Sequence, residues 1–302
     1  MPFLIVSAQA DAFDDAAIFK EAVGRFQPSK PAAVMSYDVS YTLAHFRLKR
    51  VAGATIKAIE GVWQGLVANE RKPAYLIDFQ VASPRAGGGS VRLTKRTVCV
   101  LTMPDLTIIR YVKKNDEVIT PFFGRERRTN YSEVYDFESG ALTYRHYDQI
   151  SGAVGSNLVN MTDMQVQSKE VADVLQSLFA AYQRQPAEAN ICGNKVHFNV
   201  DGTVMSFELK TRKGRVAVPA LSQKIGALYA DIQPVAGCDG GSESFSMWCV
   251  PFRDFAKEKR DPALSQLAET SQACSMLPLS GEYALFLGSL QCTLTNVCAE
   301  VN

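Results

Sequence analysis

Paired zinc ligands and serine-hydrolase motifs are missing from this sequence. The 302 residues contain three histidines, no Cys-x-x-Cys pair and no Gly-x-Ser-x-Gly segment. A structural zinc site requires clustered cysteine and histidine ligands, and the nucleophile elbow of an α/β-hydrolase requires the glycine-serine-glycine turn. The triple glycine at 87–89 precedes a β-rich run and lacks the Lys-Ser or Lys-Thr ending of a phosphate loop. We therefore expect no metal, no nucleotide and no other cofactor.

Neither sign of charge dominates the chain. Its 32 basic and 31 acidic residues give a net charge of +1, so no overall field attracts nucleic acid or an anionic membrane. A long uncharged stretch at 283–299 is interrupted by glycine, serine, threonine and asparagine, and it is too polar for a membrane-spanning helix. We expect no nucleic-acid partner and no transmembrane segment in the mature chain.

The first ten residues resemble the end of an export signal. Residues 2–6 are apolar, Ala8-Gln9-Ala10 is a small-x-small triplet typical of signal cleavage, and acidic residues follow from Asp11. The segment has no basic n-region and its apolar run is short, so an ordinary strand at the start of a cytosolic protein is the alternative. The export interpretation predicts a periplasmic or otherwise exported protein whose ordered structure begins near residue 13.

Cysteine is concentrated in the last third of the chain, with Cys99 standing apart. In an oxidising compartment the six clustered cysteines predict disulfides whose pairing the sequence does not determine. If 292–298 forms one extended strand, the cysteines at its two ends lie roughly 20 Å apart, which is beyond disulfide reach. The disulfide candidates are Cys192, Cys238, Cys249, Cys274, Cys292 and Cys298.

Hydrophobic spacing predicts a few helices in a chain made mostly of strands. Residues 13–26 have helical spacing, residues 169–184 carry one continuous apolar stripe, and a short helix can start at Asp261-Pro262. A shift of alternation after Leu43 predicts a bulge or bend, and Asp201-Gly202 predicts a tight hairpin. Alternation with a period of two predicts strands at 37–48, 54–58, 75–81, 92–101, 107–112, 116–121, 196–200, 205–209, 216–218, 228–232, 245–249, 283–287 and 290–294, with a hairpin at 134–147.

The order of these elements predicts a mainly β fold. We expect a large antiparallel, barrel-like or half-barrel sheet with a central packing helix at about 169–184 and a short N-terminal helix. Residues 1–10 are assigned to the signal remnant, 11–34 to the N-terminal helix and linker, and 35–302 to a single β-rich domain. Two halves that meet near 150–195 are the alternative organisation.

Several short segments resemble an exported bacterial family, domain-of-unknown-function family 3108. They include Tyr37-Asp38-Val39-Ser40-Tyr41, the passage from Ile109 to Asp116, the Asp201-Gly202 hairpin and Ser246-Met247-Trp248-Cys249-Val250-Pro251. The resemblance covers roughly residues 35–298, while the cysteines and the segment between Phe255 and Ser275 depart from the family pattern. It implies a barrel-like envelope protein similar in outline to lipocalin and lipoprotein-carrier folds, and it implies no catalytic residues.

Two groups of side chains are candidates for ligand contact. The arginines of the loop after Gly124 could hold a phosphate or carboxylate, although a solvated turn is the simpler interpretation. These arginines are Arg125, Arg127 and Arg128. Aromatic residues in the strands could line a cavity for an apolar ligand, although such residues more often fill the interior of a barrel. The candidates are Tyr41, Trp63, Tyr75, Phe79, Phe207 and Trp248.

His146 is the remaining residue of chemical interest. On a strand it shares a face with Tyr144 and Asp148, and a surface ladder pair is the favoured interpretation. We therefore expect a non-enzymatic envelope protein that binds or carries a lipid or another apolar or amphiphilic molecule. A structural or protein-interaction protein with a filled core, in contact with other envelope proteins, is the alternative. A hydrolase-like enzyme is the third hypothesis.

Overall fold

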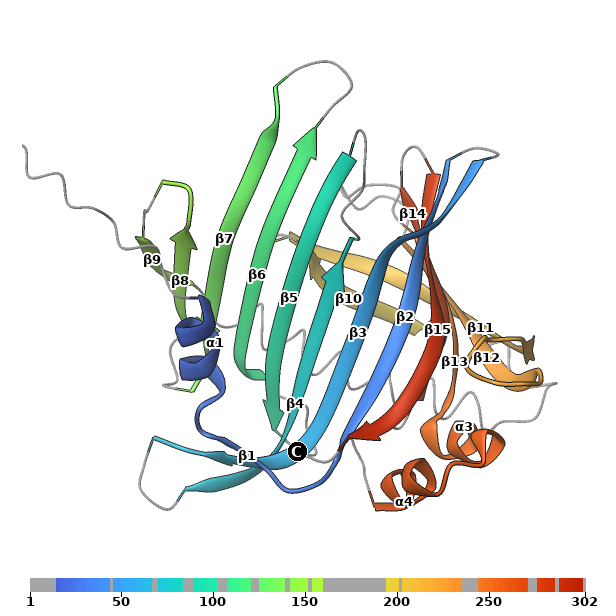
Figure 1. The fold of residues 1–302 in the computed structure, drawn as a ribbon. Coiled ribbons are helices and arrows are strands. Elements are labelled where there is room, and N and C mark those ends of the chain that lie inside the picture. Colours follow the sequence, from blue (N-terminus) through green and yellow to red (C-terminus); the bar gives the residue numbers. More distant parts are fainter. Residues whose placement is uncertain are drawn as a thin grey trace, which may run out of the picture.

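The computed structural model describes residues 15–43, 46–66, 70–83, 90–102, 108–120, 125–138, 142–151, 154–159, 194–200, 203–234, 244–270, 276–285 and 288–300. Three short helices and a long series of strands make up these residues (Figure 1). In chain order the elements are α1 (Asp15–Val23), β1 (Phe26–Pro28), β2 (Ala32–Leu43), β3 (Phe46–Gln64), β4 (Arg71–Ala82), β5 (Ser90–Thr102), β6 (Ile108–Thr120), β7 (Arg127–Asp136), β8 (Leu142–Asp148), β9 (Val154–Val159), β10 (Asn194–Val200), β11 (Thr203–Val216), β12 (Ile225–Pro234), β13 (Phe245–Pro251), α3 (Phe252–Lys259), α4 (Pro262–Thr270), β14 (Met276–Leu285) and β15 (Gly288–Glu300).

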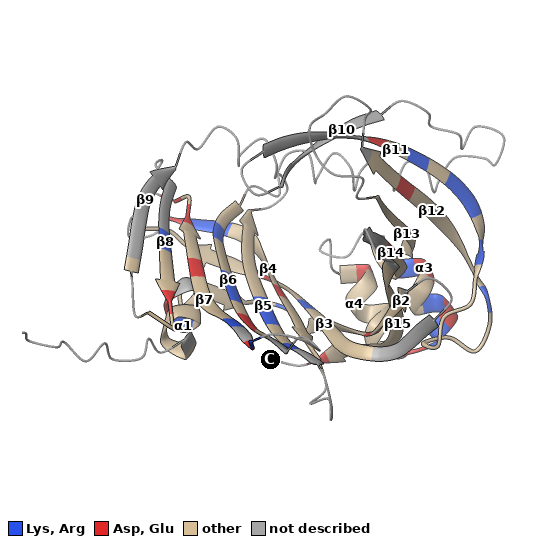
Figure 2. Cartoon of the chain, turned by 90° about the horizontal axis from the view of Figure 1, so that it is seen from above, with Lys and Arg blue, Asp and Glu red and all other residues tan. Residues whose placement is uncertain are grey.

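All of these strands belong to one antiparallel sheet. Within the described residues its 15 strands follow the order β10-β11-β12-β13-β14-β15-β2-β3-β4-β5-β6-β7-β8-β9, and β1 pairs with β3 beside this path. Figure 2 shows that the sheet curls, with α3 and α4 inside the curl and α1 on its outer side. The prediction of a mainly β fold with a large antiparallel half-barrel sheet is confirmed.

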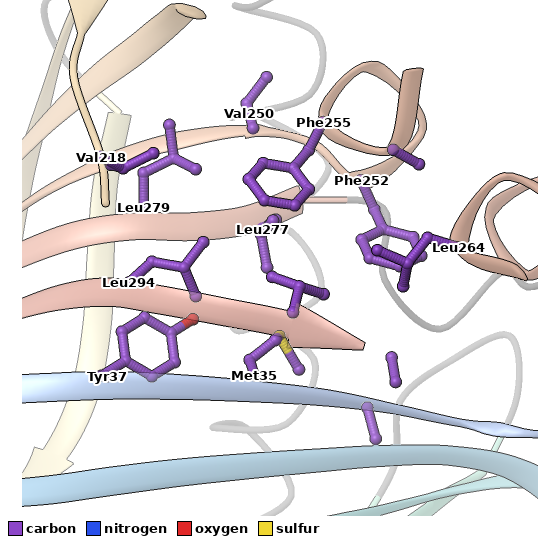
Figure 3. Close-up of a cluster of buried hydrophobic side chains, with 14 of the residues drawn as sticks. Met35, Tyr37, Val218, Val250, Phe252, Phe255, Leu264, Leu277, Leu279 and Leu294 are labelled. Carbon is purple, nitrogen blue, oxygen red and sulfur yellow. The ribbon is translucent and has the colours of Figure 1, made fainter. Parts of the chain in front are cut away.

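The concave side of the curl holds the larger apolar core. Met35 and Tyr37 of β2 point toward Leu277, Leu279 and Leu294 of β14 and β15, and α3 and α4 cover them (Figure 3). The Tyr37 hydroxyl donates a hydrogen bond of 3.0 Å to the Pro278 carbonyl, so this buried polar group has the partner that burial demands. We call this group of side chains the concave core.

The outer side of the sheet holds a second core beneath α1. Phe19 of α1 packs with Ile59, Trp63, Leu76 and Val98, side chains that point away from the concave core. A Cβ atom at Gly61 would lie 2.5 Å from the Phe26 ring, so only glycine lets β1 approach β3 this closely. We call this group the outer core. In the described part of the chain, no helix has the length and apolar character needed to cross a bilayer.

Several details of the secondary structure differ from the sequence predictions. The change of phase after Leu43, predicted as a bulge or bend within a strand, separates two antiparallel strands, with Leu43 opposite Phe46. Residues 107–121 contribute one strand, β6, where two were predicted, and helix α3 was not predicted. The Asp201-Gly202 hairpin is confirmed by the pairing of Val200 with Thr203.

Two predicted segments cannot be compared with the fold. The helix at 169–184 and the signal remnant at 1–10 lie outside the described residues. At the N-terminal end, α1 occupies Asp15–Val23 within the predicted helical region 13–26. Near the C-terminal end, α4 begins at Pro262 as predicted, because the Asp261 side chain accepts hydrogen bonds from the backbone N–H groups of Ala263 and Leu264.

Truncating a side chain that packs helix α3 into the concave core should greatly lower the free energy of unfolding. Phe255 of α3 is fully buried there, so Phe255→Ala should lower the free energy of unfolding by about 3–5 kcal/mol. Phe245 of β13 is 36% exposed, and Phe245→Ala should cost less than about 1.5 kcal/mol. Urea denaturation of both variants measures this difference. Equal losses would contradict the assignment of α3 to the concave core.

Candidate functional site

Cross-strand pairing places one continuous row of side chains along the concave face. Directly opposed residues in adjacent strands point to the same side of a sheet, so the face of each residue follows from its partners. Starting at β2 and ending at β8, this row contains Met35, Ile56, Phe79, Thr97, Lys113, Glu133 and His146. The row therefore begins in the concave core and ends in charged residues.

The charged end of the row is a paired cluster. Glu133 is largely buried, and its carboxylate lies 3.7 Å from Lys113 Nζ and 3.5 Å from His146 Nδ1. Tyr131 lies beside both of these groups: its ring centroid is 5.6 Å from Lys113 Nζ and 5.2 Å from the His146 ring centroid. We call Lys113, Tyr131, Glu133 and His146 the polar cluster. Four side chains from three strands thus share one ion-pair and ring-contact network.

Burial and charge shift two pKa values around this cluster. Burial lowers the pKa of Lys113, but the nearby Tyr131 and Glu133 more than offset this effect, and the net pKa is raised. Burial raises the pKa of Tyr111, partly offset by its hydrogen bond with Thr97. Both groups therefore keep their protons at neutral pH, and the cluster presents a permanent cation.

An apolar band lies between the polar cluster and the concave core. It consists of half-buried or exposed side chains on the concave face of β4 and β5, and Phe79 is 36% exposed. Phe79 is opposite Thr97, which is opposite Lys113, so two strand spacings, about 10 Å, separate Phe79 from the polar cluster. The band contains Ile77, Phe79, Leu93 and Leu101.

The predicted aromatic lining is divided between the two faces of the sheet. Tyr41, Tyr75 and Phe79 lie on the concave face, and so does Trp248, which packs against the concave core. Trp63 points to the outer side, where it is 1% exposed. Phe207 belongs to β11, but its side chain lies outside the described residues.

Trp63 has a structural role on the outer face. Its indole Nε1 donates a 3.0 Å hydrogen bond to Glu138, and the Glu138 carboxylate also pairs with Arg25. The guanidinium carbons of Arg25 and Arg110 lie 4.8 Å and 5.7 Å from the centre of the Trp63 ring. This network joins the segment after α1 to the end of β7 and leaves Trp63 without access to a concave-face ligand.

Trp248 belongs to a separate stack on the concave face. Its ring lies 5.1 Å from that of Tyr229, and the Arg212 guanidinium lies 4.5 Å from the Tyr229 ring. A Cβ atom at Gly214 would lie 2.7 Å from the Trp248 ring, so the ring covers this glycine. These contacts anchor β11, β12 and β13 to one another.

The predicted anion site is not brought together as one group. Arg125 is exposed before β7, and Arg127 and Arg128 are consecutive residues of β7, which places their side chains on opposite faces. Arg128 shares its face with Val118 and pairs loosely, at 3.9 Å, with Asp116. The side chain of Arg127 lies outside the described residues.

The structure describes four of the seven cysteines. Cys99, Cys249, Cys292 and Cys298 are free thiols, whereas Cys192, Cys238 and Cys274 lie outside the described residues. Cys292 and Cys298 belong to the single strand β15, which meets the condition under which they cannot bridge each other. Among the described residues, no three His, Cys, Asp or Glu side chains are grouped to hold a metal ion.

Sequence reasoning missed most of the polar cluster. His146 was considered with Asp148, but the Asp148 carboxylate accepts hydrogen bonds from the Ile150 N–H and the Ser151 hydroxyl, and these bonds lower its pKa. His146 also lies 3.5 Å from the carboxylate of Glu133 in the adjacent strand β7. The available signal was alternation: Tyr111, Lys113 and Asn115 share one face of β6, while Val112 points to the outer core.

A solved structure with a barrel-like sheet is similar to this chain. It is the crystal structure of a beta-barrel-like protein of domain-of-unknown-function family 1849 from Brucella abortus, with a TM-score of 0.44 and 10% sequence identity. The match covers 91% of this chain and 100% of that chain. No protein-family model matches the chain, and no curated protein matches it.

The thiols give a labelling prediction. Burial raises the pKa values of Cys99 and Cys249 to about 12, so at pH 8 only about one in ten thousand of each is the reactive thiolate. Cys298 is exposed. Iodoacetamide at pH 8 should therefore label Cys298 in the native protein and reach Cys99 and Cys249 only after denaturation, as read by peptide mass spectrometry.

Two outcomes would contradict this assignment. Native labelling of Cys99 at the rate of Cys298 would show that its thiol is not buried. Labelling of Cys298 that appears only after reduction would show that it forms a disulfide. Because thiolate forms only as the pH approaches 12, the labelling rate of Cys99 should stay low from pH 7 to pH 10.

Proposed function

We propose that this protein is a non-enzymatic binder or carrier of an amphiphilic ligand, which lies on the concave face of the sheet. The supporting observation is the single row from Ile56 and Phe79 through Thr97 to Lys113 and Glu133. An amphiphile has an apolar chain joined to a polar head, and this row offers apolar and charged contacts in the same order. The ligand class is a lipid or a lipid-like molecule.

The side chains of the row favour ligand binding over a role in filling the interior of the sheet. A core that only fills space gains stability from apolar side chains, and a buried ion pair contributes little net stability there. Yet the concave face changes from the concave core to the half-buried apolar band and then to the largely buried Glu133 with its two basic neighbours. Half-buried aromatic and aliphatic groups next to a few placed polar groups are typical of ligand sites.

The cellular location of the protein is part of the same proposal. The N-terminal segment with its Ala8-Gln9-Ala10 triplet supports export, and the short segments that resemble domain-of-unknown-function family 3108 support an envelope protein. An exported protein beside a membrane meets amphiphiles as its most abundant apolar molecules. A periplasmic location and membership of that family are therefore proposed together with the ligand class.

A structural role is the second candidate. It is favoured by the concave core, where α3 and α4 cover β14, β15 and β2 and fill that part of the curl. On this account the apolar band would be a further part of a filled interior, and no lipid would bind. Ligand binding by the purified protein decides between the two.

Native mass spectrometry of protein purified from the periplasm of a bacterial host provides this test. We expect lipid adducts that survive gentle ionisation and that weaken about tenfold in Phe79→Glu, because a charge at the exposed apolar position opposes the acyl chain. Leu66→Glu is the control, since Leu66 is 66% exposed at the end of β3, away from this row. Absence of adducts across lipid classes would contradict the proposal and support the structural role.

A further inference from the structure

Three polar side chains without partners lie at adjacent positions on the concave face, next to the polar cluster. Asn115 of β6 is 4% exposed, and its Oδ1 atom accepts no hydrogen bond. Lys95 of β5 is directly opposite Asn115, and Glu117 follows two residues later on the same face of β6. Among the described residues, neither Lys95 nor Glu117 has a hydrogen bond or an ion pair. One cation, one anion and one acceptor thus remain unused at one place.

The missing Lys95–Glu117 ion pair is informative. Diagonal neighbours on one face of a sheet have Cβ atoms about 7–8 Å apart, a separation that two long side chains can bridge. The two side chains nevertheless form no ion pair, although Lys95 is opposite Asn115 and Glu117 is two residues further along β6. A buried amide oxygen without a donor costs about 1–3 kcal/mol, and such a cost is usually explained by a missing water, ion or ligand.

The three groups define the chemistry of the molecule that would complete them. The half-buried Lys95 can pair with an anionic oxygen and the half-buried Glu117 with a cation, while the buried Asn115 Oδ1 requires an N–H or O–H donor. A primary ammonium satisfies both Glu117 and Asn115, because it carries a positive charge and three N–H donors. A phosphate joined to that ammonium by a short linker satisfies Lys95. This combination is a zwitterionic phosphoethanolamine group.

We propose that Lys95, Asn115 and Glu117 form a binding site for a zwitterionic headgroup that carries a phosphate and a primary ammonium. This assignment rests on the proposed function, because it gives the headgroup of the amphiphile whose chain lies on the apolar band. The position agrees with that role: Lys95 is opposite Val81 of β4 and Asn115 is opposite Tyr131 of the polar cluster. The headgroup site therefore lies between the apolar band and the polar cluster.

Lysolipids with one acyl chain and different headgroups test this site by isothermal titration calorimetry. The wild-type protein should bind the phosphoethanolamine lipid about tenfold more tightly than the phosphocholine lipid, which has the same charges but no N–H donor. Asn115→Leu should remove most of this preference and leave phosphocholine binding unchanged, whereas Glu117→Gln should weaken both lipids and weaken the phosphoethanolamine lipid more, because its N–H donors also bond to the carboxylate. Lys95→Met should weaken both lipids, because both carry the phosphate.

A matched control separates the site from general effects of removing an amide. Asn130 of β7 also has an unpartnered Oδ1, but it is opposite Asp116 on the outer side of the sheet. Asn130→Leu should leave the preference for phosphoethanolamine intact. Urea denaturation serves as the folding check, and Asn115→Leu should be at least as stable as the wild type, since it removes an unsatisfied buried group.

The outcomes distinguish this inference from the proposed function. Equal binding of both lipids, or a preference that survives Glu117→Gln and Asn115→Leu, would overturn the headgroup site while leaving the amphiphile proposal in place. Failure of every lipid to bind would overturn both. Free phosphoethanolamine bound as tightly as the lipid, with the same variant pattern, would support the site and contradict the role of the apolar band.

Discussion

The antiparallel pairing from β10 to β9 is the constraint on which the rest of this structure depends. It places consecutive residues on opposite faces, so the side chains of each strand in the middle of the sheet lie in two different environments. Strand β2 shows this directly: Met35 and Tyr37 enter the concave core, while Ala32 enters the outer core. A shift of one residue in this register would exchange the two faces and expose both cores.

The same constraint explains why the concave face changes character along the sheet. Where α3 and α4 cover it, the face is apolar and well packed, with Leu277, Leu279 and Leu294 fully buried. Across β5 to β8 the corresponding positions become Thr97, Lys113, Glu133 and His146. The outer face of these strands meanwhile contributes Val98, Val112 and Val134 to the outer core. Thr97, Lys113, Glu133 and His146 thus form one row across the concave face of four adjacent strands.

Local signals made much of the fold predictable. Alternation gave the strands and the antiparallel sheet, the Asp201-Gly202 turn gave the β10–β11 hairpin, and Asp261-Pro262 gave α4. Helix α3 escaped prediction because its buried side chains are confined to Phe252, Phe255 and Ala256 within a charged segment. The two strands predicted in place of β6 were separated at its polar residues 113–116, which resemble a turn when the neighbouring strands are unknown.

The site was much less predictable than the fold. Lys113, Glu133 and His146 come from three strands, and only the register places them in one row. Trp63 shows the converse: its residue type suggested a ligand contact, but its position in β3 sends it to Glu138 on the outer side. Aromatic content indicates that rings are present, whereas the face that each ring occupies depends on pairing between distant segments.

Photo-crosslinking with a lipid that carries a diazirine in its acyl chain shows which face of the sheet holds the ligand, because the label reports which side chains the acyl chain contacts. We expect crosslinks on β4 and β5 at concave-face positions such as Ile77, Phe79 and Leu101. Residues that enter the outer core from the same strands, such as Leu76 and Val98, should remain unlabelled. Equal labelling of both faces, or labelling of the outer face alone, would contradict a ligand held on the concave face of the sheet.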